Sequence, residues 1–483
     1  MTTQHYTTMA SSSSSSPLSI FFSLLFFSAA VSAVKLSLSP FSHLDGDYSL
    51  SSGDPYPFLS RLATASVARS RFLKNPNSKH SSSSSAVSAS AAAVKPPLAA
   101  RSYGGYSVSL SFGKPPQTLP FVFDTGSSLV WFPCTSRYLC SDCLFSNVDP
   151  NQIPRFIPKN STTTRIIGCQ SPKCKLLFGP SVKCQRCGPN TQNCTEACPP
   201  YIIQYGLGST AGILLSETLD FTDLAVPDFL VGCSILSTRQ PEGIAGFGRG
   251  PESLPAQMGL KRFSYCLVSR RFDDTAVTSD LVLETGSGSK KTPGLIYTPF
   301  RKNPNVSNVA FQDYYYVNLR RIYVGGKRVK IPYEFLAPGS DGNGGSIVDS
   351  GSTFTFLERP VYDLVAKEFE TQMGNYSRDT RIEKLTGLGP CFNISGDESV
   401  TVPDLVFEFK GGAQMKLPVS NFFSFVGSSD NVCLTVVSET TVNPTGVRSG
   451  PAIIVGSFQQ QNYQVEFDLE NERFGFMKKR CNS

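Results

Sequence analysis

Two short acidic motifs contain the residues best suited to chemistry. Asp124 begins the sequence Asp-Thr-Gly-Ser, and Asp349 begins the similar sequence Asp-Ser-Gly-Ser. Each aspartate follows an apolar run typical of a buried strand. The glycine of each motif permits a tight turn in which neighbouring hydroxyls and amides can hydrogen-bond the carboxylate. One such motif alone is weak evidence, because most copies are ordinary turns or helix caps.

The two motifs belong to an imperfect internal repeat. Residues 121–127 resemble residues 346–352, and each aspartate is followed, 122 and 107 residues later, by the last residue of a second shared element, Gly246 or Gly456. The repeat predicts two homologous lobes whose pseudo-twofold axis brings Asp124 and Asp349 together. Two carboxylates about 3 Å apart cannot both ionise easily, so they share a proton. Such a pair can activate a water and protonate a carbonyl oxygen, which suffices to hydrolyse an amide.

The histidine content excludes several competing mechanisms. The three histidines of the 483-residue chain are His5, His43 and His80. If the folded protein lies beyond residue 80, Ser-His-Asp and Cys-His catalysis and imidazole metal sites are excluded there. Acid–base chemistry then falls on carboxylates, Lys, Tyr or Cys.

The elements that must position these residues are mainly strands. The sequence alternates apolar and polar residues over 106–112, has a buried-strand pattern over 119–124, and continues with short strands separated by Gly and Pro. Helical signals are few, at about 252–258 and 359–372. The length predicts two domains plus processing segments.

The N-terminal hundred residues predict processing rather than catalysis. An apolar run ends in a V-x-A pattern, which predicts a signal peptide over 1–33 cleaved after Ala33. Residues 34–100 are low in complexity and basic, so by themselves they are expected to be poorly ordered. They are either a flexible linker or a pro-segment whose positive charge covers an acidic cleft until it is removed. The basic residues of this stretch include Arg61, Arg69, Arg71, Lys74 and Lys79.

All fourteen cysteines lie after residue 133, which suggests disulfides formed in an oxidising compartment. A four-thiolate zinc site is the competing interpretation, because CxxC spacings occur at 140/143 and 184/187. Five sequons fit a secretory route: Asn160, Asn193, Asn305, Asn375 and Asn393. Beyond residue 100 the chain has 37 basic and 34 acidic residues, a net charge of +3, so we expect no nucleic-acid partner. The sequence contains no second long apolar run and no lipid-anchor signal, so we expect no membrane anchor.

These motifs, in their order, resemble pepsin-type aspartic endopeptidases, specifically the plant nepenthesin-like branch. The resemblance covers roughly residues 103–479. It implies an all-β, bilobal pepsin-like acid protease fold, with two homologous β-barrel-like lobes and the active site in the cleft between them. The matching segments are 106–117, 123–131, 204–209, 243–250, 263–267, 349–353 and 454–457.

The resemblance implies a role for each matched residue. Asp124 and Asp349 resemble the catalytic dyad, supported by the glycines Gly126 and Gly351. Thr125 and Ser350 match hydroxyls that bond across to the opposite loop, and Ser127 and Ser352 match hydroxyls that bond the outer carboxylate oxygens. Tyr205 and Gly206 match the flap, a hairpin that closes over substrate, and Trp131 matches the indole that bonds the flap tyrosine.

The resemblance also implies the domain organisation and part of the disulfide pattern. The N-terminal lobe would span 101–296, with a Cys-rich insertion at 134–198 and the flap at 201–212. An interlobe linker at 297–310 and a C-terminal lobe at 311–483 would follow. Cys391 would pair with Cys433, and Cys266 with Cys481, while pairing among the ten cysteines between residues 134 and 233 stays open.

The resemblance predicts a secreted, monomeric aspartic endopeptidase that acts on proteins or peptides at acidic pH, without metal or cofactor, and is sensitive to pepstatin-like inhibitors. We expect an extracellular location, in the cell wall or apoplast, with the vacuole as the alternative. The rival hypothesis is a catalytically inactive pepsin-fold inhibitor of cell-wall-degrading glycosidases. Such inhibitors usually have one damaged active-site motif, whereas both motifs are intact here.

Overall fold

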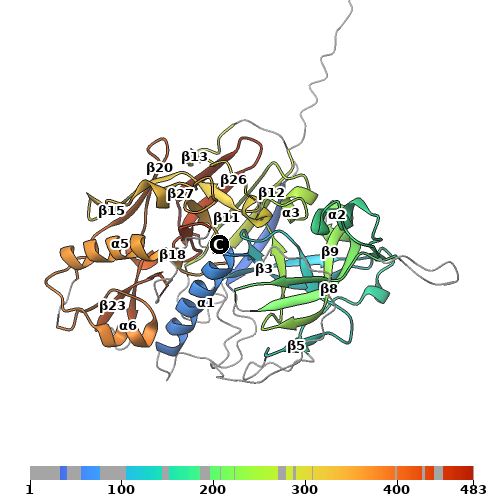
Figure 1. Ribbon diagram of the computed structural model, residues 1–483, viewed down its shortest axis with the longest axis horizontal. Helices are drawn as coiled ribbons and strands as arrows, with labels where there is room; N and C mark the ends of the chain where they lie inside the picture. Colours follow the sequence, from blue (N-terminus) through green and yellow to red (C-terminus); the bar gives the residue numbers. More distant parts are fainter. Residues whose placement is uncertain are drawn as a thin grey trace, which may run out of the picture.

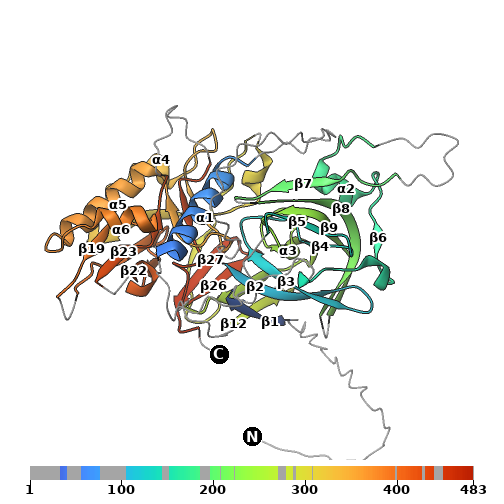
Figure 2. The ribbon, with the colours of Figure 1, turned by 90° about the horizontal axis from the view of Figure 1, so that it is seen from below.

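The computed structural model describes residues 33–40, 56–76, 105–143, 152–184, 196–206, 208–221, 224–269, 279–286, 290–306, 308–396, 400–426, 430–439 and 450–481. Its two halves lie side by side, joined by strands from both ends of the chain (Figure 1). Figure 2 shows the helix α1 (Tyr56–Lys74) lying between the two halves.

The largest sheet has fifteen strands among the described residues and runs from the junction of the two halves through the N-terminal lobe. Its order is β13 (Ile296–Pro299), β27 (Arg473–Lys478), β26 (Tyr463–Asp468), β11 (Arg262–Cys266), β12 (Ser279–Glu284), β1 (Ala33–Pro40), β2 (Tyr106–Phe112), β3 (Gln117–Asp124), β10 (Gly243–Gly246), β4 (Trp131–Pro133), β9 (Leu224–Thr238), β8 (Ser209–Phe221) and β6 (Arg165–Ile166), with β5 (Leu139–Ser141) beside β9 and β7 (Tyr201–Gln204) beside β8.

Three smaller sheets form the C-terminal lobe, on the left of Figure 1. The first has the order β14 (Tyr315–Val317), β17 (Ser346–Val348), β25 (Ile453–Val455), β18 (Thr355–Leu357), β24 (Val436–Val437). The second has the order β16 (Lys327–Arg328), β15 (Leu319–Val324), β20 (Leu405–Phe409), β21 (Gln414–Lys416), and the third β19 (Cys391–Asn393), β23 (Asn431–Leu434), β22 (Phe423–Val426).

The remaining helices are short, apart from α5. They are α2 (Pro172–Phe178), α3 (Leu254–Gln257), α4 (Tyr333–Leu336), α5 (Arg359–Gln372) and α6 (Thr380–Thr386), with 3-10 turns η2 (Pro158–Asn160), η3 (Val309–Gln312) and η4 (Val419–Asn421). The helix predicted at 359–372 has these bounds. The one predicted at 252–258 is the shorter α3, capped by Ser253 and with Pro255 in its first turn.

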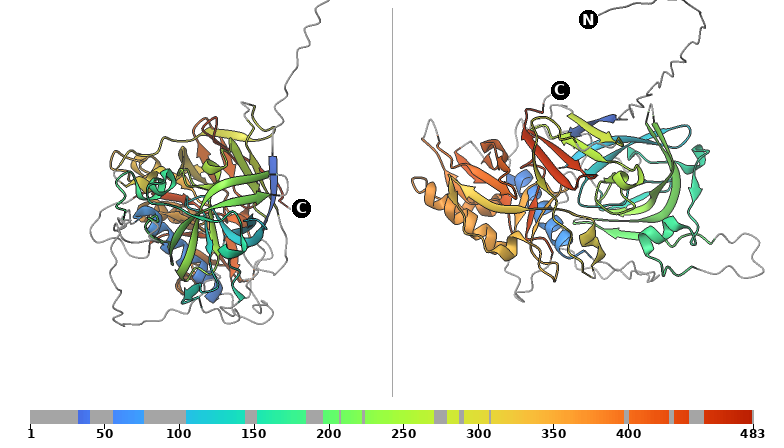
Figure 3. Two further views of the ribbon diagram at one scale, coloured as in Figure 1. Left: turned by 90° about the vertical axis from the view of Figure 1, so that its right-hand side faces the viewer. Right: turned by 90° about the horizontal axis from the view of Figure 1, so that it is seen from above.

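The core explains why the strands form where they do. In β2 and β3 the apolar residues Val108, Leu110, Phe121 and Phe123 are fully or almost fully buried. Aromatic side chains then join the lobes: Phe263 of β11 stacks on Phe467 of β26 with ring centroids 4.6 Å apart. The first residues of the segment predicted as an interlobe linker, 297–299, belong to β13, which pairs with β27. The right-hand view of Figure 3 shows the red C-terminal strands between the lobes.

Candidate active site

Both aspartates lie at the ends of strands with equivalent neighbours. Asp124 ends β3, which runs parallel to β10, and its carbonyl accepts a hydrogen bond from the Phe247 N–H at 2.7 Å. Asp349 follows β17, which runs parallel to β25, and its N–H donates to the Val455 carbonyl at 3.0 Å. The second element of the sequence repeat thus lies beside the first in each lobe.

Reciprocal hydrogen bonds join the two loops across the lobe boundary. The Thr125 N–H donates to Ser350 Oγ at 3.0 Å, and the Ser350 N–H donates to Thr125 Oγ1 at 2.9 Å. Ser350 Oγ also donates to the Phe123 carbonyl at 2.9 Å. These residues are buried, so each bond replaces one that water would otherwise make. The bonds fix one loop relative to the other.

Each carboxylate has matching donors from its own loop. Ser127 Oγ donates to Asp124 Oδ2 and Ser352 Oγ to Asp349 Oδ2, both at 2.6 Å. The Gly126 N–H donates to Asp124 Oδ1 at 2.9 Å, and the Gly351 N–H donates to Asp349 Oδ1 at 3.0 Å. The two aspartates therefore have equivalent hydrogen-bond partners.

The motif glycines are required by close approach. A Cβ atom at Gly126 would lie 2.5 Å from Asp349 Oδ1, and one at Gly351 would lie 2.4 Å from Asp124 Oδ1. Each loop therefore packs directly on the carboxylate of the other lobe. Any larger residue would separate the two acids.

The predicted flap tyrosine, Tyr205, and Trp131 form a hydrogen-bonded pair. Trp131 Nε1 donates to Tyr205 Oη at 2.8 Å, and both residues are buried. The Tyr205 N–H donates to the Gly208 carbonyl at 2.6 Å, which closes the hairpin between β7 and β8. Leu207, between them, lies outside the described residues. Trp131 therefore fixes the position of the tyrosine hydroxyl.

A cation of the N-terminal segment, the guanidinium of Arg69, forms ion pairs with both carboxylates of the dyad. Arg69 of α1 donates from Nη2 to Asp124 Oδ1 at 2.7 Å and from Nε to Asp349 Oδ2 at 3.1 Å. The flap closes over the same residue, because a Cβ at Gly206 would lie 2.6 Å from Arg69 Cα. The hollow that remains beside Arg69 is small, about 30 Å³, and is lined by Ala65, Tyr205 and Gln240, among others.

The electrostatics of the two acids differ. Burial raises the pKa of Asp124, and the nearby Asp349 charge adds to this rise against the opposing effect of Arg69. Burial also raises the pKa of Asp349, but the charge and hydrogen bonds of Arg69 and a bond from Ser352 outweigh it and hold that pKa below its ordinary value. With α1 in place, Arg69 thus acts to lower both pKa values, but it outweighs burial only at Asp349.

Helix α1 forms because one of its faces is apolar and finds a partner. Leu59, Leu62, Ala63 and Leu73 recur at helical spacing and are almost fully buried. They pack against C-terminal-lobe residues that include Phe354, Phe356, Ile382 and Leu388. The sequence predicts that residues 34–100 are poorly ordered by themselves; within the folded chain, β1 and residues 56–74 are ordered because each finds a complementary partner.

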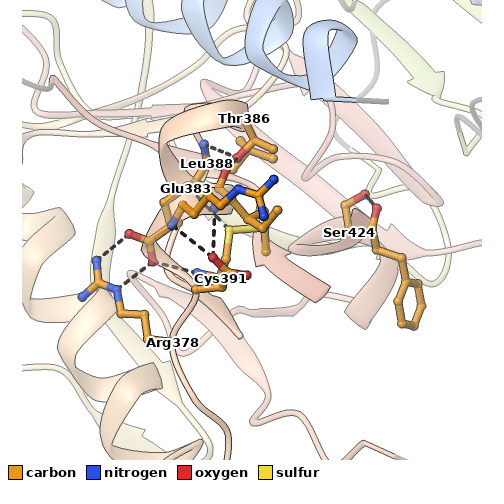
Figure 4. Close-up of a disulfide and its surroundings, with 12 residues drawn as sticks. Arg378, Glu383, Thr386, Leu388, Cys391 and Ser424 are labelled. Carbon is orange, nitrogen blue, oxygen red and sulfur yellow. Dashed lines mark hydrogen bonds and ion pairs between the residues drawn. A yellow bond between two sulfur atoms is a disulfide. The ribbon is translucent and has the colours of Figure 1, made fainter. Parts of the chain in front are cut away.

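The surface under α1 is itself firmly held (Figure 4). Glu383 of α6 accepts two hydrogen bonds from Arg378, at 2.7 and 2.8 Å, and one from the Cys391 N–H at 3.0 Å. Cys391 forms a disulfide with Cys433 on the neighbouring strand. The carboxylate thus ties α6 to β19, and α1 packs against α6.

The other predicted cysteines and sequons fall in several places. Cys266 and Cys481 form a disulfide, and so do four further pairs: Cys134–Cys233, Cys140–Cys143, Cys169–Cys184 and Cys174–Cys198. Cys187 lies outside the described residues, and the other three cysteines considered for zinc are among these disulfides. Asn160, Asn305 and Asn375 are exposed and Asn393 is half-buried, whereas Asn193 lies outside the described residues.

Two absences are confined to the described part of the chain. There, no cluster of three or more His, Cys, Asp or Glu side chains is placed to hold a metal ion. Nor does any helix in those ranges have both the length and the apolar character needed to cross a bilayer.

Sequence reasoning did not assign Arg69 to the site. The available signal was the spacing of Leu59, Leu62, Ser66, Arg69 and Leu73, which places all five on one helical face. The runs of serine and alanine that follow in the same segment hid this pattern. A cation at the centre of an otherwise apolar face indicates that an acidic partner lies opposite.

Comparison with known proteins identifies the family. Residues 106–283 match the family model "Xylanase inhibitor N-terminal", and residues 314–478 match "Xylanase inhibitor C-terminal". A probable aspartyl protease of Arabidopsis thaliana is 31% identical over 426 residues, covering 78% of this chain and 82% of the relative. Aspartic proteinase nepenthesin-2 of Nepenthes gracilis is 32% identical over 391 residues, covering 78% of each.

Solved structures show the same fold. The crystal structure of edgp matches with a TM-score of 0.58 and 22% identity, covering 78% of this chain and 92% of that one. Basic 7S globulin from soybean matches with a TM-score of 0.55 and 19% identity over the same shares. With this fold, the paired aspartate loops and these relatives, the chain belongs to the pepsin-like family of plant aspartyl proteases that includes the nepenthesins.

Proposed function

We propose that the chain is the zymogen of a secreted aspartic endopeptidase. In this proposal Asp124 and Asp349 hydrolyse peptide bonds at acidic pH once the segment 34–100 has been removed. The observation that carries the proposal is the pair of equivalent carboxylates, each with its own serine and glycine donors and locked together by Thr125 and Ser350. A binding protein has no need of this arrangement.

The geometry supports a general acid–base mechanism. With Arg69 gone, the two carboxyls would share one proton. The ionised carboxylate would take a proton from a water as the water oxygen attacks the peptide carbonyl carbon, and the protonated partner would donate its proton to the carbonyl oxygen. The tetrahedral diol then collapses, the C–N bond breaks, and the nitrogen leaves with a proton returned from the dyad. Tyr205, held by Trp131, would close over the extended substrate.

Arg69 supports the zymogen part of the proposal. Its guanidinium lies against both carboxylates, where the attacking water and the scissile carbonyl would have to be. The closed flap and the helix backbone exclude an extended peptide from the same space. Residues 34–100 therefore act as a pro-segment rather than as a flexible linker.

The test uses the secreted chain, purified at neutral pH and then acidified to about pH 3–5. The proposal expects removal of the pro-segment and the appearance of pepstatin-sensitive cleavage of a protein substrate. Asp124→Asn and Asp349→Asn should each abolish cleavage, whereas Asp228→Asn, at an exposed ion pair with Lys173, should not. Full activity in either dyad variant would contradict the mechanism.

The inhibitor hypothesis is the second candidate, and the names of the matching family models favour it. In that case the acidified protein would cleave nothing and would instead bind a microbial xylanase tightly. The intact dyad favours the protease. The same preparation, assayed for proteolysis and for xylanase inhibition, separates the two.

A further inference from the structure

Helix α1 carries a second buried cation, five residues beyond Arg69. Lys74 Nζ lies 3.2 Å from Glu358 Oε2, and the two side chains are 6% and 11% exposed. The same ammonium lies 5.2 Å from the centre of the Phe356 ring, which is fully buried. Carboxylate and aromatic face together form a pocket for a long cationic side chain.

The pocket belongs to the C-terminal lobe rather than to the pro-segment. Phe356 lies in β18, and Glu358 immediately precedes α5, with its backbone N–H bonded to the Ala452 carbonyl at 2.8 Å. The adjacent Arg359 does not neutralise Glu358, because its Nε donates to Asp363 at 2.8 Å. Glu358 Oε2 makes no hydrogen bond among the described residues, and the ion pair with Lys74 is its contact with a charged group.

The pro-segment backbone is held at this point as a ligand would be. Tyr314 Oη donates to the Leu73 carbonyl at 3.2 Å, and a Cβ at Gly450 would lie 2.7 Å from Lys74 Cα. On the other side of the cleft, the Phe72 and Tyr205 rings lie 6.1 Å apart. Residues 72–74 thus cross from the flap to the C-terminal lobe beside the dyad.

The distance to the dyad fits a substrate subsite. The Asp349 N–H bonds the Val455 carbonyl and the Glu358 N–H bonds the Ala452 carbonyl, three residues earlier along the same extended segment. At about 3.3 Å per strand residue this separation is about 10 Å. The pocket therefore lies about three residues along an extended substrate, or about two when the reach of a lysine or arginine side chain is included. When α1 leaves, Glu358 loses the cation that pairs with it, and the cationic side chain of a substrate can take that place.

We infer that the Glu358–Phe356 pocket is a substrate subsite that selects a lysine or arginine two or three residues from the scissile bond. Lys74 occupies this subsite in the closed form. The inference rests on the proposed peptidase function and specifies its substrates as proteins with a basic residue near the cleaved bond.

The test is a cleavage-site profile of the processed enzyme on a peptide library, followed by kinetics on matched peptides that carry Lys or norleucine at the selected position. Wild type should favour Lys roughly tenfold or more in kcat/KM, as expected for a desolvated charge pair. Glu358→Gln should bring that ratio close to one. Glu368→Gln, at an acid of α5 that pairs with Lys327, should keep the wild-type ratio.

The outcomes separate the two levels of inference. If the processed wild type cleaves library peptides without a basic preference within three residues of the cut, the subsite is refuted and the peptidase function stands. A ratio that is equal in wild type and Glu358→Gln refutes it as well. If no peptide is cleaved with pepstatin sensitivity, the proposed function fails and the subsite fails with it.

Discussion

The contact between Arg69 and the dyad makes a sharp prediction about activation. Arg69→Met keeps most of the side-chain volume and removes the charge from a group that forms ion pairs at 2.7 and 3.1 Å. Arg71→Met is the matched control, because Arg71 lies on the exposed face of the same helix. We expect the first variant, and not the second, to become activated at higher pH than the wild type.

The magnitude follows from burial. Arg69 and both carboxyl side chains are less than one-tenth exposed, and removing one partner of a buried charge pair costs about 2–5 kcal/mol. Since 1.4 kcal/mol is a factor of ten, the closed state should lose about 30-fold to a few thousand-fold against the open state. The lower end of this range applies at acidic pH, because protonation of the dyad removes the negative charge that Arg69→Met leaves unpaired.

The pH dependence has a definite sign. In the closed state burial raises the pKa of Asp349, but Arg69 outweighs it and lowers that pKa, and opening removes this effect. The resulting stabilisation is fully present above the open-state pKa and is lost as the pH falls through the closed-state pKa. Through Asp349, acid therefore favours the open state of the wild type, whereas Arg69→Met lacks this stabilisation at neutral pH.

The assay follows purified zymogens from pH 7 to pH 3, recording pro-segment cleavage on gels and hydrolysis of a fluorogenic peptide. The expected result is a midpoint of activation at clearly higher pH for Arg69→Met, with Arg71→Met at the wild-type midpoint. If all three proteins activate at the same pH, Arg69 does not hold the pro-segment on the dyad, and the reasoning from its ion pairs is wrong.

Three further predictions follow from other contacts. Trp131→Phe removes the donor to Tyr205 and should lower kcat/KM about tenfold with an unchanged far-UV spectrum; an unchanged kcat/KM would show that the indole only packs. Burial raises the pKa of Glu242 to about 8. Between the ordinary pKa and about pH 8 the folded protein keeps this carboxyl protonated while the unfolded chain loses the proton, so the free energy of unfolding falls as the pH rises. Glu242→Gln should therefore reduce the fall in Tm between pH 5 and 8, and an identical fall in both proteins would contradict this. Replacing Cys391 and Cys433 with alanine opens a link across 42 residues and should cost about 4 kcal/mol of stability, measured by urea unfolding against a Cys140→Ala/Cys143→Ala control that closes a far shorter loop.

Much of the dyad could be predicted from sequence because its chemistry is local. The strand, the aspartate and the glycine turn are consecutive residues, and the repeat shows that two such units exist. The Thr125–Ser350 exchange came from family resemblance, since no local pattern shows which hydroxyl crosses to the other lobe. α5 was predictable to its ends because Pro360 and its apolar periodicity mark it.

Contacts between distant segments were beyond the sequence. Arg69 meets acids 55 and 280 residues away; its helical face signals an acidic partner, but nothing near it in the chain identifies which acids these are. The Lys74–Glu358 ion pair likewise joins residues that are far apart in the sequence. The resemblance placed residues 297–299 in the interlobe linker, yet β27, almost at the other end of the chain, supplies their hydrogen bonds.

The position of β1 has a practical consequence for handling the protein. Its backbone pairs with β12 over six residues and with β2 over three, so it fills the middle of the largest sheet. A protease that cuts between β1 and α1 as well as beyond α1 would leave this strand in place as a short, non-covalently held peptide. Excising it would expose two rows of unpaired backbone groups, which promote sheet-to-sheet association. A sample matured in vitro should therefore be analysed by native as well as denaturing mass spectrometry, because a denaturing spectrum alone would miss that the strand is still bound.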